Sequence, residues 1–267
     1  MKVYISADIE GIAGVVDWKE ADKAESDYRP CSVQMTREVN AACEGAINVG
    51  AKEIWIKDAH DSGRNIDINN LPTMVRVIRS WSEHPFGMMQ ELDSTFEAVI
   101  LIGYHSGAGT GGNPLAHTYS SEKIACLKIN GELADEFLIN TYTAGLVKVP
   151  VVFVSGDESL CNTVKKLNDN IRTVPTKKGV GNSVITSHPD EVAAKTKTAV
   201  QEALNEKNRL LCKVELPPEF KIEISYIKHT QAYKASFYPG VSRLNPNTIL
   251  FETDDYFEVL RMFSFLL

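Results

Sequence analysis

The chain has 267 residues, of which 43% are hydrophobic and 24% are charged, and its formal net charge is −7. This composition is typical of a folded globular protein and excludes a disordered chain, and no apolar run approaches the roughly 20 residues of a membrane-spanning helix. Because no run of five or more like charges occurs, neither nucleic acid nor an anionic membrane is expected as a partner.

Four short apolar runs, rich in valine, isoleucine and aromatic residues, predict buried strands at residues 3–7, 53–57, 98–104 and 149–155. Between the first two, apolar residues at helical spacing predict a helix over 32–49, which Gly50 ends. This order of strand, helix and strand indicates a parallel crossover. A second helix is predicted over 132–147, directly before the fourth strand.

The last third of the chain has a different pattern. A third helix is predicted over 189–207, with Ser187 as its cap and Pro189 in its first turn. After about Cys212, strands predicted at 221–227 and 248–252 are separated by prolines. We therefore predict an α/β fold with a mostly parallel sheet flanked by helices and a smaller C-terminal α+β portion. The expected division is a metal-binding catalytic domain at 1–187 and the smaller portion at 188–267.

Polar residues that can bind metals follow the predicted strands. They are Asp8 and Glu10 in SADIEG, Asp58 and His60 in KDAHDSG, His105 in GYHSG, and Asp157 in SGD. Because ligands of open α/β sheets bind at the carboxyl ends of the strands, these side chains are expected to converge. Carboxylate and imidazole together suit zinc, manganese or a similar divalent ion in an open catalytic site.

The spacing within the first two motifs leaves alternatives open. Asp8 and Glu10 are two residues apart, so both could reach one ion, or Asp8 could bridge two ions. In the second motif, one of Asp58 and His60 is expected to bind metal while the other orients its neighbours, and we favour His60 as the ligand. Asp157 is interpreted as a supporting residue or a strand-end cap.

The segment after His105 is rich in glycine and contains a further histidine, His117. It lacks the Gly-Lys-Ser/Thr ending of a phosphate-binding loop, so it is interpreted as a mobile flap. His84, His188 and His229 have no acidic partner at ligand spacing, and surface or packing roles are expected for them.

In chain order, these motifs resemble the zinc-dependent D-aminopeptidases of bacterial dipeptide-transport operons. The resemblance covers about residues 1–185 and rests on several short motifs. They are SxDxEG at 6–11, DAH at 58–60 with GRN at 63–65, GYH at 103–105, LAHT at 115–118, the Asn-Gly pair at 130–131, Glu136 with Asn140, and VPVVFVSGD at 149–157. We therefore expect the fold and activity of that family.

The resemblance implies five metal ligands and one catalytic histidine. Asp8 would bridge two zinc ions, Glu10 and His60 would complete one site, and His105 and Glu136 would complete the other. His117 matches the histidine that acts in catalysis. Glu132 is the fallback for Glu136, which is preferred because only Glu136 has an asparagine four residues later.

The resemblance also implies the reaction: hydrolysis of short peptides that contain D-amino acids, such as D-alanyl-D-alanine, by a metal-activated water. Two zinc ions per subunit are expected, with manganese or another divalent ion as an alternative. A homo-oligomer is implied as well, with a ring-stacked decamer as one form. Two other interpretations stay open: a two-metal phosphoesterase, because Asp58-x-His60 and Gly156-Asp157 are similar to its opening motifs, and a non-catalytic metal-binding oligomer.

The five cysteines are single and scattered, which predicts neither a disulfide framework nor a thiolate zinc site. The first residues lead directly into a strand and lack the basic and apolar segments of a signal peptide. A cytoplasmic location is therefore expected.

Overall fold

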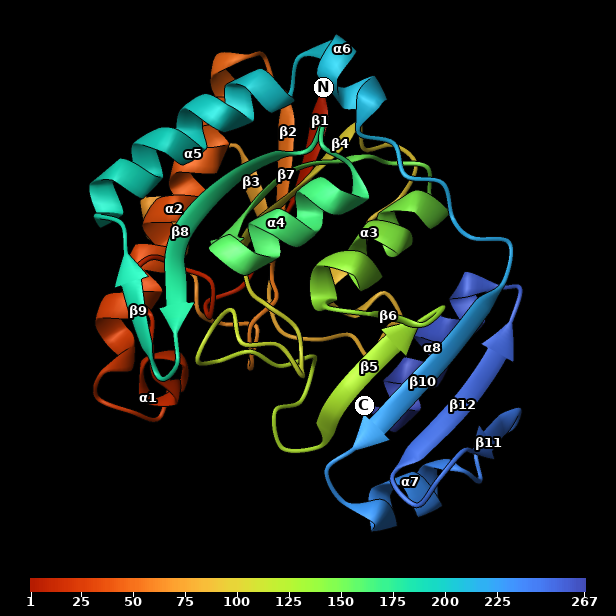
Figure 1. The fold of residues 1–267 in the computed structure, drawn as a ribbon. Coiled ribbons are helices and arrows are strands. Elements are labelled where there is room, and N and C mark those ends of the chain that lie inside the picture. The colour runs from red at the N-terminus through yellow and green to blue at the C-terminus, as the bar shows by residue number, and fades with distance from the viewer.

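The computed structural model describes residues 1–267 and contains two sheets (Figure 1). The larger sheet has the strand order β3-β2-β1-β4-β7-β8-β9, and every strand is parallel to its neighbours except β9, which is antiparallel to β8. Its strands are β1 (Lys2–Ala7), β2 (Glu53–Asp58), β3 (Val75–Ile78), β4 (Ala98–Tyr104), β7 (Val151–Asp157), β8 (Arg172–Val180) and β9 (Ser183–Thr186).

The second sheet is antiparallel, with the strand order β11-β12-β10-β5-β6. Its strands are β5 (Ile124–Ile129), β6 (Glu132–Leu133), β10 (Phe220–Tyr226), β11 (Val241–Arg243) and β12 (Thr248–Thr253). The helices α7 (His229–Ala235) and α8 (Tyr256–Leu266) pack against it. Each sheet has its own apolar core, and the larger core belongs to the parallel sheet.

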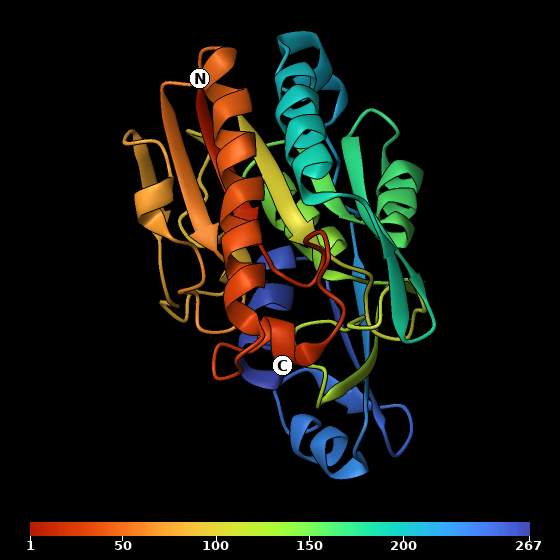
Figure 2. The same cartoon turned by 90° about the vertical axis from the view of Figure 1, so that its left-hand side faces the viewer.

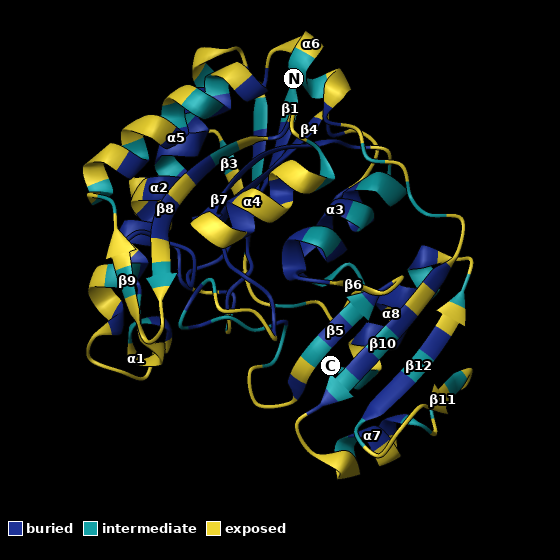
Figure 3. Ribbon diagram, in the orientation of Figure 1, coloured by how far each residue is buried: buried dark blue, intermediate teal, exposed yellow.

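Helices cover both faces of the parallel sheet, and every residue of β4 and β7 is buried (Figure 3). On one face, α2 (Tyr28–Asn48) and α5 (Pro189–Ala203) lie side by side (Figure 2). The helices α3 (Glu136–Leu146) and α4 (Glu158–Leu167) lie on the other face. This arrangement explains why the central strands are continuous apolar runs rather than alternating ones. The short elements are α1 (Trp18–Ala21), α6 (Glu206–Leu211), and the 3₁₀ turns Ile68–Asn70 and Gly87–Met89.

The predicted fold class is confirmed, as are the four parallel strands and the two strands after residue 212. The helix expected at 132–147 begins only at Glu136, because the Asp135 side chain accepts a hydrogen bond from the Leu138 amide and caps the helix there. Glu132 instead belongs to β6. The helix expected at 32–49 begins earlier, at Tyr28.

The helix expected at 189–207 ends at Ala203 and is followed by α6. Its cap is His188 rather than Ser187, because the His188 side chain accepts the Asp190 amide hydrogen. Proline does stand in the first turn, as predicted.

The predicted boundary at residue 187 does not separate the two sheets. Strands β5 and β6 precede it yet belong to the second sheet, whereas α5 follows it and packs on α2 of the first. The chain therefore crosses between the sheets more than once, which local composition does not reveal. None of the helices combines the length and apolarity that a membrane span requires.

Glu38 is a buried carboxyl on α2, beneath the loop that follows β1. Its Oε1 accepts hydrogen bonds from the Ala13 amide at 3.1 Å and from Gln34 Nε2 at 3.0 Å, while its Oε2 has no partner. Burial raises the pKa of Glu38 to about 7. In an unfolded chain the pKa of a glutamate is about 4.3.

Between these two pKa values the folded protein binds more protons than the unfolded chain, so stability should fall as the pH rises from about 4.3 to about 7. We expect Glu38→Gln, which mimics the protonated carboxyl, to reduce this loss by about 2 kcal/mol between pH 5 and pH 7.5. Urea unfolding at the two pH values measures the difference, with the exposed Glu25→Gln as control. Equal losses in the wild type and in Glu38→Gln would contradict the expectation.

Candidate metal centre

The residues predicted to bind metal gather beyond the carboxyl ends of β1, β2 and β4, at the end of the parallel sheet that points toward the second sheet (Figure 1). A pocket of about 480 Å³ opens there. Strand β1 has β2 on one side and β4 on the other, so this is the crevice where open α/β sheets bind their ligands. The residues brought together are those predicted from the sequence. They are Asp8, Glu10, His60, His105, His117 and Glu136. Their roles as ligands and catalyst stay a prediction.

The turn after β1 places Glu10 against β4. The Gly11 amide donates a hydrogen bond to the Gly103 carbonyl at 2.8 Å, and a Cβ on Gly11 would lie 1.8 Å from the Tyr104 carbonyl oxygen. Only glycine therefore permits this close approach. Gly11 thus permits the turn by packing backbone against backbone.

His60 faces two carboxylates. Its Nε2 donates a hydrogen bond to the Ala21 carbonyl at 2.8 Å, and its Nδ1 lies 3.1 Å from Asp8 Oδ1 and 3.2 Å from Glu10 Oε2. The backbone contact places the ring hydrogen on Nε2, so in the neutral ring Nδ1 carries a lone pair directed at two anions. Either a second ring proton or a metal cation relieves this arrangement, and a backbone partner on the far nitrogen is typical of metal-bound histidine.

His105 repeats this pattern at the other side of Asp8. Its Nδ1 donates to the Ser106 carbonyl at 3.0 Å, and its Nε2 lies 3.6 Å from Asp8 Oδ2 and 3.5 Å from Glu136 Oε2. Glu136 is itself fixed, because its Oε1 accepts the Tyr119 amide hydrogen at 2.7 Å. Asp8 thus belongs to two groups of potential ligands, one on each side.

His117 lies beside both groups, in the loop before β5. Its Nδ1 donates to the Leu115 carbonyl at 2.9 Å, which leaves Nε2 directed toward Glu10 Oε1 at 3.9 Å. Its ring stacks on the ring of His105 at 4.3 Å, and Trp18 packs edge-on against it at 5.2 Å. The ring is therefore held in one orientation with a free nitrogen facing the pocket.

The electrostatics of the pocket favour positive charge. Burial and the Glu10 carboxylate raise the pKa of Asp8 to about 6. Burial opposes the charged form of both histidines, yet the pKa of His60 is held well above its ordinary value by Glu10 and Asp8, and that of His105 by Glu136 and Asp8. Three carboxylates close together in a buried site repel one another unless cations lie between them.

Two buried atoms of the pocket test whether a metal fits. Glu10 Oε2 and His105 Nε2 are enclosed and have no hydrogen-bond partner. An unpaired buried polar atom costs about 1–3 kcal/mol, and coordination to a cation would satisfy each of these atoms. The donor set of three carboxylates and two or three imidazoles is one that zinc accepts. The residues therefore fit divalent metal.

Asp58 and Asp157 act on the backbone that carries the histidines. Asp58 Oδ2 accepts the Ile66 amide hydrogen at 2.8 Å and its Oδ1 accepts Asn65 Nδ2 at 2.8 Å, which shapes the loop containing His60. Asp157 caps α4 and accepts the Ser106 amide hydrogen at 2.7 Å, next to His105. The fallback ligand Glu132 is exposed on β6, so Glu136 is the glutamate that reaches the cluster.

Several contributors to the site were not predicted. Lys177 is buried and its Nζ donates to the carbonyls of Glu10 and Val15, which holds the loop after β1 in place. Asn113 Nδ2 also donates to the Glu10 carbonyl, at 3.0 Å. Trp81, an aromatic residue that lines the pocket, also belongs to no motif. A lysine in the segment TKKGV resembles a surface residue, so no local signal could have identified it.

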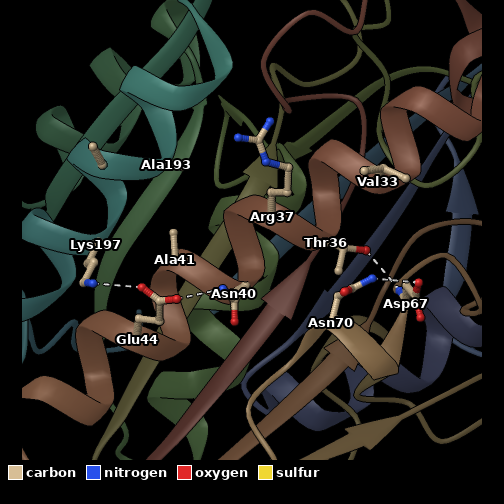
Figure 4. A pocket seen from close by; sticks show the side chains of 11 residues that line it. Val33, Thr36, Arg37, Asn40, Ala41, Glu44, Asp67, Asn70, Ala193 and Lys197 are labelled. Atoms are coloured by element: carbon tan, nitrogen blue, oxygen red, sulfur yellow. Dashed lines mark hydrogen bonds and ion pairs between the residues drawn. The ribbon is translucent and has the colours of Figure 1, made fainter.

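A second hollow, of about 500 Å³, lies between α2 and α5 (Figure 4) and contains none of the residues that line the pocket at the strand ends. It is lined by charged and small side chains, and Lys197 of α5 pairs with Glu44 of α2 across it at 2.8 Å. It contains no histidine and no buried unpaired acid, so the candidate centre is the pocket at the strand ends.

Comparison with known proteins agrees with this geometry. A family model for peptidase M55, D-aminopeptidase, matches residues 1–265. A D-aminopeptidase of Bacillus subtilis (strain 168) is 29% identical over 260 residues, which cover 97% of this chain and 93% of the relative. A solved structure, that of the zinc-dependent D-aminopeptidase DppA of Bacillus subtilis, a self-compartmentalizing protease, superposes with a TM-score of 0.93 at 26% identity and covers 100% of this chain and 96% of the other. The chain belongs to the M55 family of D-aminopeptidases.

Proposed function

We propose that this D-aminopeptidase uses two zinc ions to release N-terminal D-residues from short peptides such as D-alanyl-D-alanine. The observation that carries the two-metal proposal is the position of Asp8. Its Oδ1 lies 3.1 Å from His60 and its Oδ2 lies 3.6 Å from His105, so the two oxygens face different ligand groups. A carboxylate placed in this way is suited to bridge two cations.

Glu10 and His60 would hold one ion with Asp8, and His105 and Glu136 would hold the other with Asp8. When bound, such a pair supplies an activated water and a Lewis acid for the scissile carbonyl. Zinc is supported by the donor set, and the related enzyme of Bacillus subtilis is zinc-dependent.

His117 would handle the proton of the reaction. Because its Nδ1–H is committed to the Leu115 carbonyl, its Nε2 is the nitrogen free to accept a proton in the pocket. The same nitrogen, once protonated, can donate to the departing amine. Rings on two sides, those of His105 and Trp18, keep it in position between these steps.

We further propose that the protein is a cytoplasmic homo-oligomer, with a ring-stacked decamer as the expected form. The related enzyme of Bacillus subtilis is a self-compartmentalizing protease, which supports an oligomeric assembly. Light scattering on the purified protein measures the assembly size.

The test of the function combines metal analysis with peptide hydrolysis. We expect about two ions per chain, release of free D-alanine from D-alanyl-D-alanine and from D-alanine amide, no release from L-alanyl-L-alanine, and loss of activity on chelation that added zinc restores. Turnover of phosphoesters with inert D-peptides would overturn the proposal, as would full D-peptide hydrolysis by protein freed of metal.

A further inference from the structure

We call the pocket of about 480 Å³ at the strand ends the metal pocket. A smaller pocket of about 270 Å³ adjoins it, and Trp81 and Tyr119 line both. The side of the smaller pocket that lies away from the metal pocket is formed by α8 and by Leu267. Its apolar lining beyond the common wall consists of Pro85, Leu260, Phe263 and Leu267. We call it the apolar pocket.

The tryptophan of the common wall is fixed from two sides. Trp81 Nε1 donates to the Asp61 carbonyl at 2.6 Å. The buried Lys57 ammonium lies 3.7 Å from the centre of the Trp81 ring, at the distance of a cation–π contact. These two contacts hold the Trp81 ring in one orientation.

The tyrosine of the common wall connects the apolar pocket with the metal centre. Its backbone amide donates to the ligand candidate Glu136, and its ring centre lies 6.3 Å from that of Phe263. Only Tyr119 therefore lies between a ligand in the apolar pocket and Glu136, which is proposed to hold metal. The next residue of a peptide bound beside Glu136 would meet the apolar pocket on the other side of Tyr119.

The charges of the two pockets differ. Beyond the ligands, the metal pocket is lined by Asp22, Asp61 and Glu122, whereas the only acidic side chain lining the apolar pocket is Glu83. The ammonium group of a peptide is attracted to the acidic pocket. The apolar side chains of a peptide bind most favourably in the apolar pocket, because burying apolar surface there displaces water.

We propose that the apolar pocket binds the side chain of the residue that follows the scissile bond, and that it selects an apolar residue there. The proposal rests on the proposed peptidase function. It assigns substrate specificity to α8 and the C-terminus, which lie outside every motif that marks the metal centre.

The test compares three substrates that have the same N-terminal residue: D-alanine amide, D-alanyl-glycine and D-alanyl-D-leucine. Filling a pocket with a leucine side chain changes specificity on the order of tenfold or more. For the wild type we therefore expect kcat/KM for D-alanyl-D-leucine to exceed that for D-alanyl-glycine by on the order of tenfold.

Two variants alter the apolar pocket. Ser264→Phe places a large side chain in the pocket from an exposed position of α8, and Leu267→Ala removes part of the wall. Both should abolish the preference for D-alanyl-D-leucine, mainly through KM, and leave D-alanine amide within about twofold of the wild type. Arg261→Phe is the matched control, because it adds the same side chain to an exposed position of α8 that does not line the pocket.

The outcomes separate this proposal from the one on which it rests. Failure of the wild type to hydrolyse D-alanine amide refutes the peptidase function itself. Hydrolysis of the amide with no preference between the dipeptides, in wild type and variants alike, refutes only the apolar pocket. D-leucine amide serves as a fourth substrate, for the variants alone. A loss in Ser264→Phe that falls on this amide instead of on D-alanyl-D-leucine also refutes the apolar pocket, because the pocket would then hold the N-terminal side chain. A changed assembly size with unaltered kinetics would make the pocket a subunit contact and also overturn the proposal.

Discussion

His60→Ala protein is expected to lose about one of the two metal ions proposed per chain, and its activity on D-alanine amide should fall by on the order of a thousandfold. The imidazole nitrogen that faces Asp8 Oδ1 at 3.1 Å and Glu10 Oε2 at 3.2 Å would be absent. Two carboxylates alone hold a zinc ion less tightly than two carboxylates with an imidazole, because zinc favours nitrogen donors at such sites. Metal analysis after gel filtration, together with the rate of D-alanine release, measures both effects.

The matched control is His229→Ala, which removes an exposed histidine at the start of α7. It should retain full metal content and activity. Circular dichroism of the two variants checks that both are folded. Full metal content in folded His60→Ala would remove this histidine from the ligand set, and with it the arrangement in which Asp8 bridges two groups.

Much of this centre was predictable from the sequence because its residues stand directly after buried strands. Once 3–7, 53–57 and 98–104 are predicted as parallel strands, their carboxyl ends must meet, so Asp8, His60 and His105 must lie together. Glu136 was harder, since it follows no strand of the parallel sheet. Its assignment came from the family resemblance, and the structure places it at the first turn of α3.

The unpredicted parts depend on contacts between distant segments. Strand β5 pairs with β10, so that Ile129 lies opposite Ile222, and no local pattern indicates that pairing. Lys177 lies in β8, where it reaches the loop after β1 through the core. For the same reason the walls of the apolar pocket were not foreseen, because they combine residues 81–90 around η2 (Gly87–Met89), Tyr119, and residues 260–267 at the end of the chain.

His117 could either move a proton or bind metal. The second role is open because its ring nitrogen lies close enough to Glu10 and His105 for the three residues to share one ion. Its nearest carboxylate oxygen, Glu10 Oε1, is 3.9 Å from its Nε2, whereas His60 lies 3.1 and 3.2 Å from two carboxylates. These differences favour proton transfer over metal binding as its role.

His117→Ala is therefore expected to keep about two ions per chain and to lose roughly 10²- to 10⁴-fold in kcat, the range for removal of a general acid or base. The loss should fall on kcat rather than KM, since the metals and the acidic residues Asp22, Asp61 and Glu122 that bind the substrate are unaltered. Metal analysis and steady-state rates with D-alanine amide, compared with His229→Ala, provide the measurement. Loss of one ion in this variant would instead make His117 a ligand of the group that contains Glu10 and His105, and the proton would then have to be moved by another side chain.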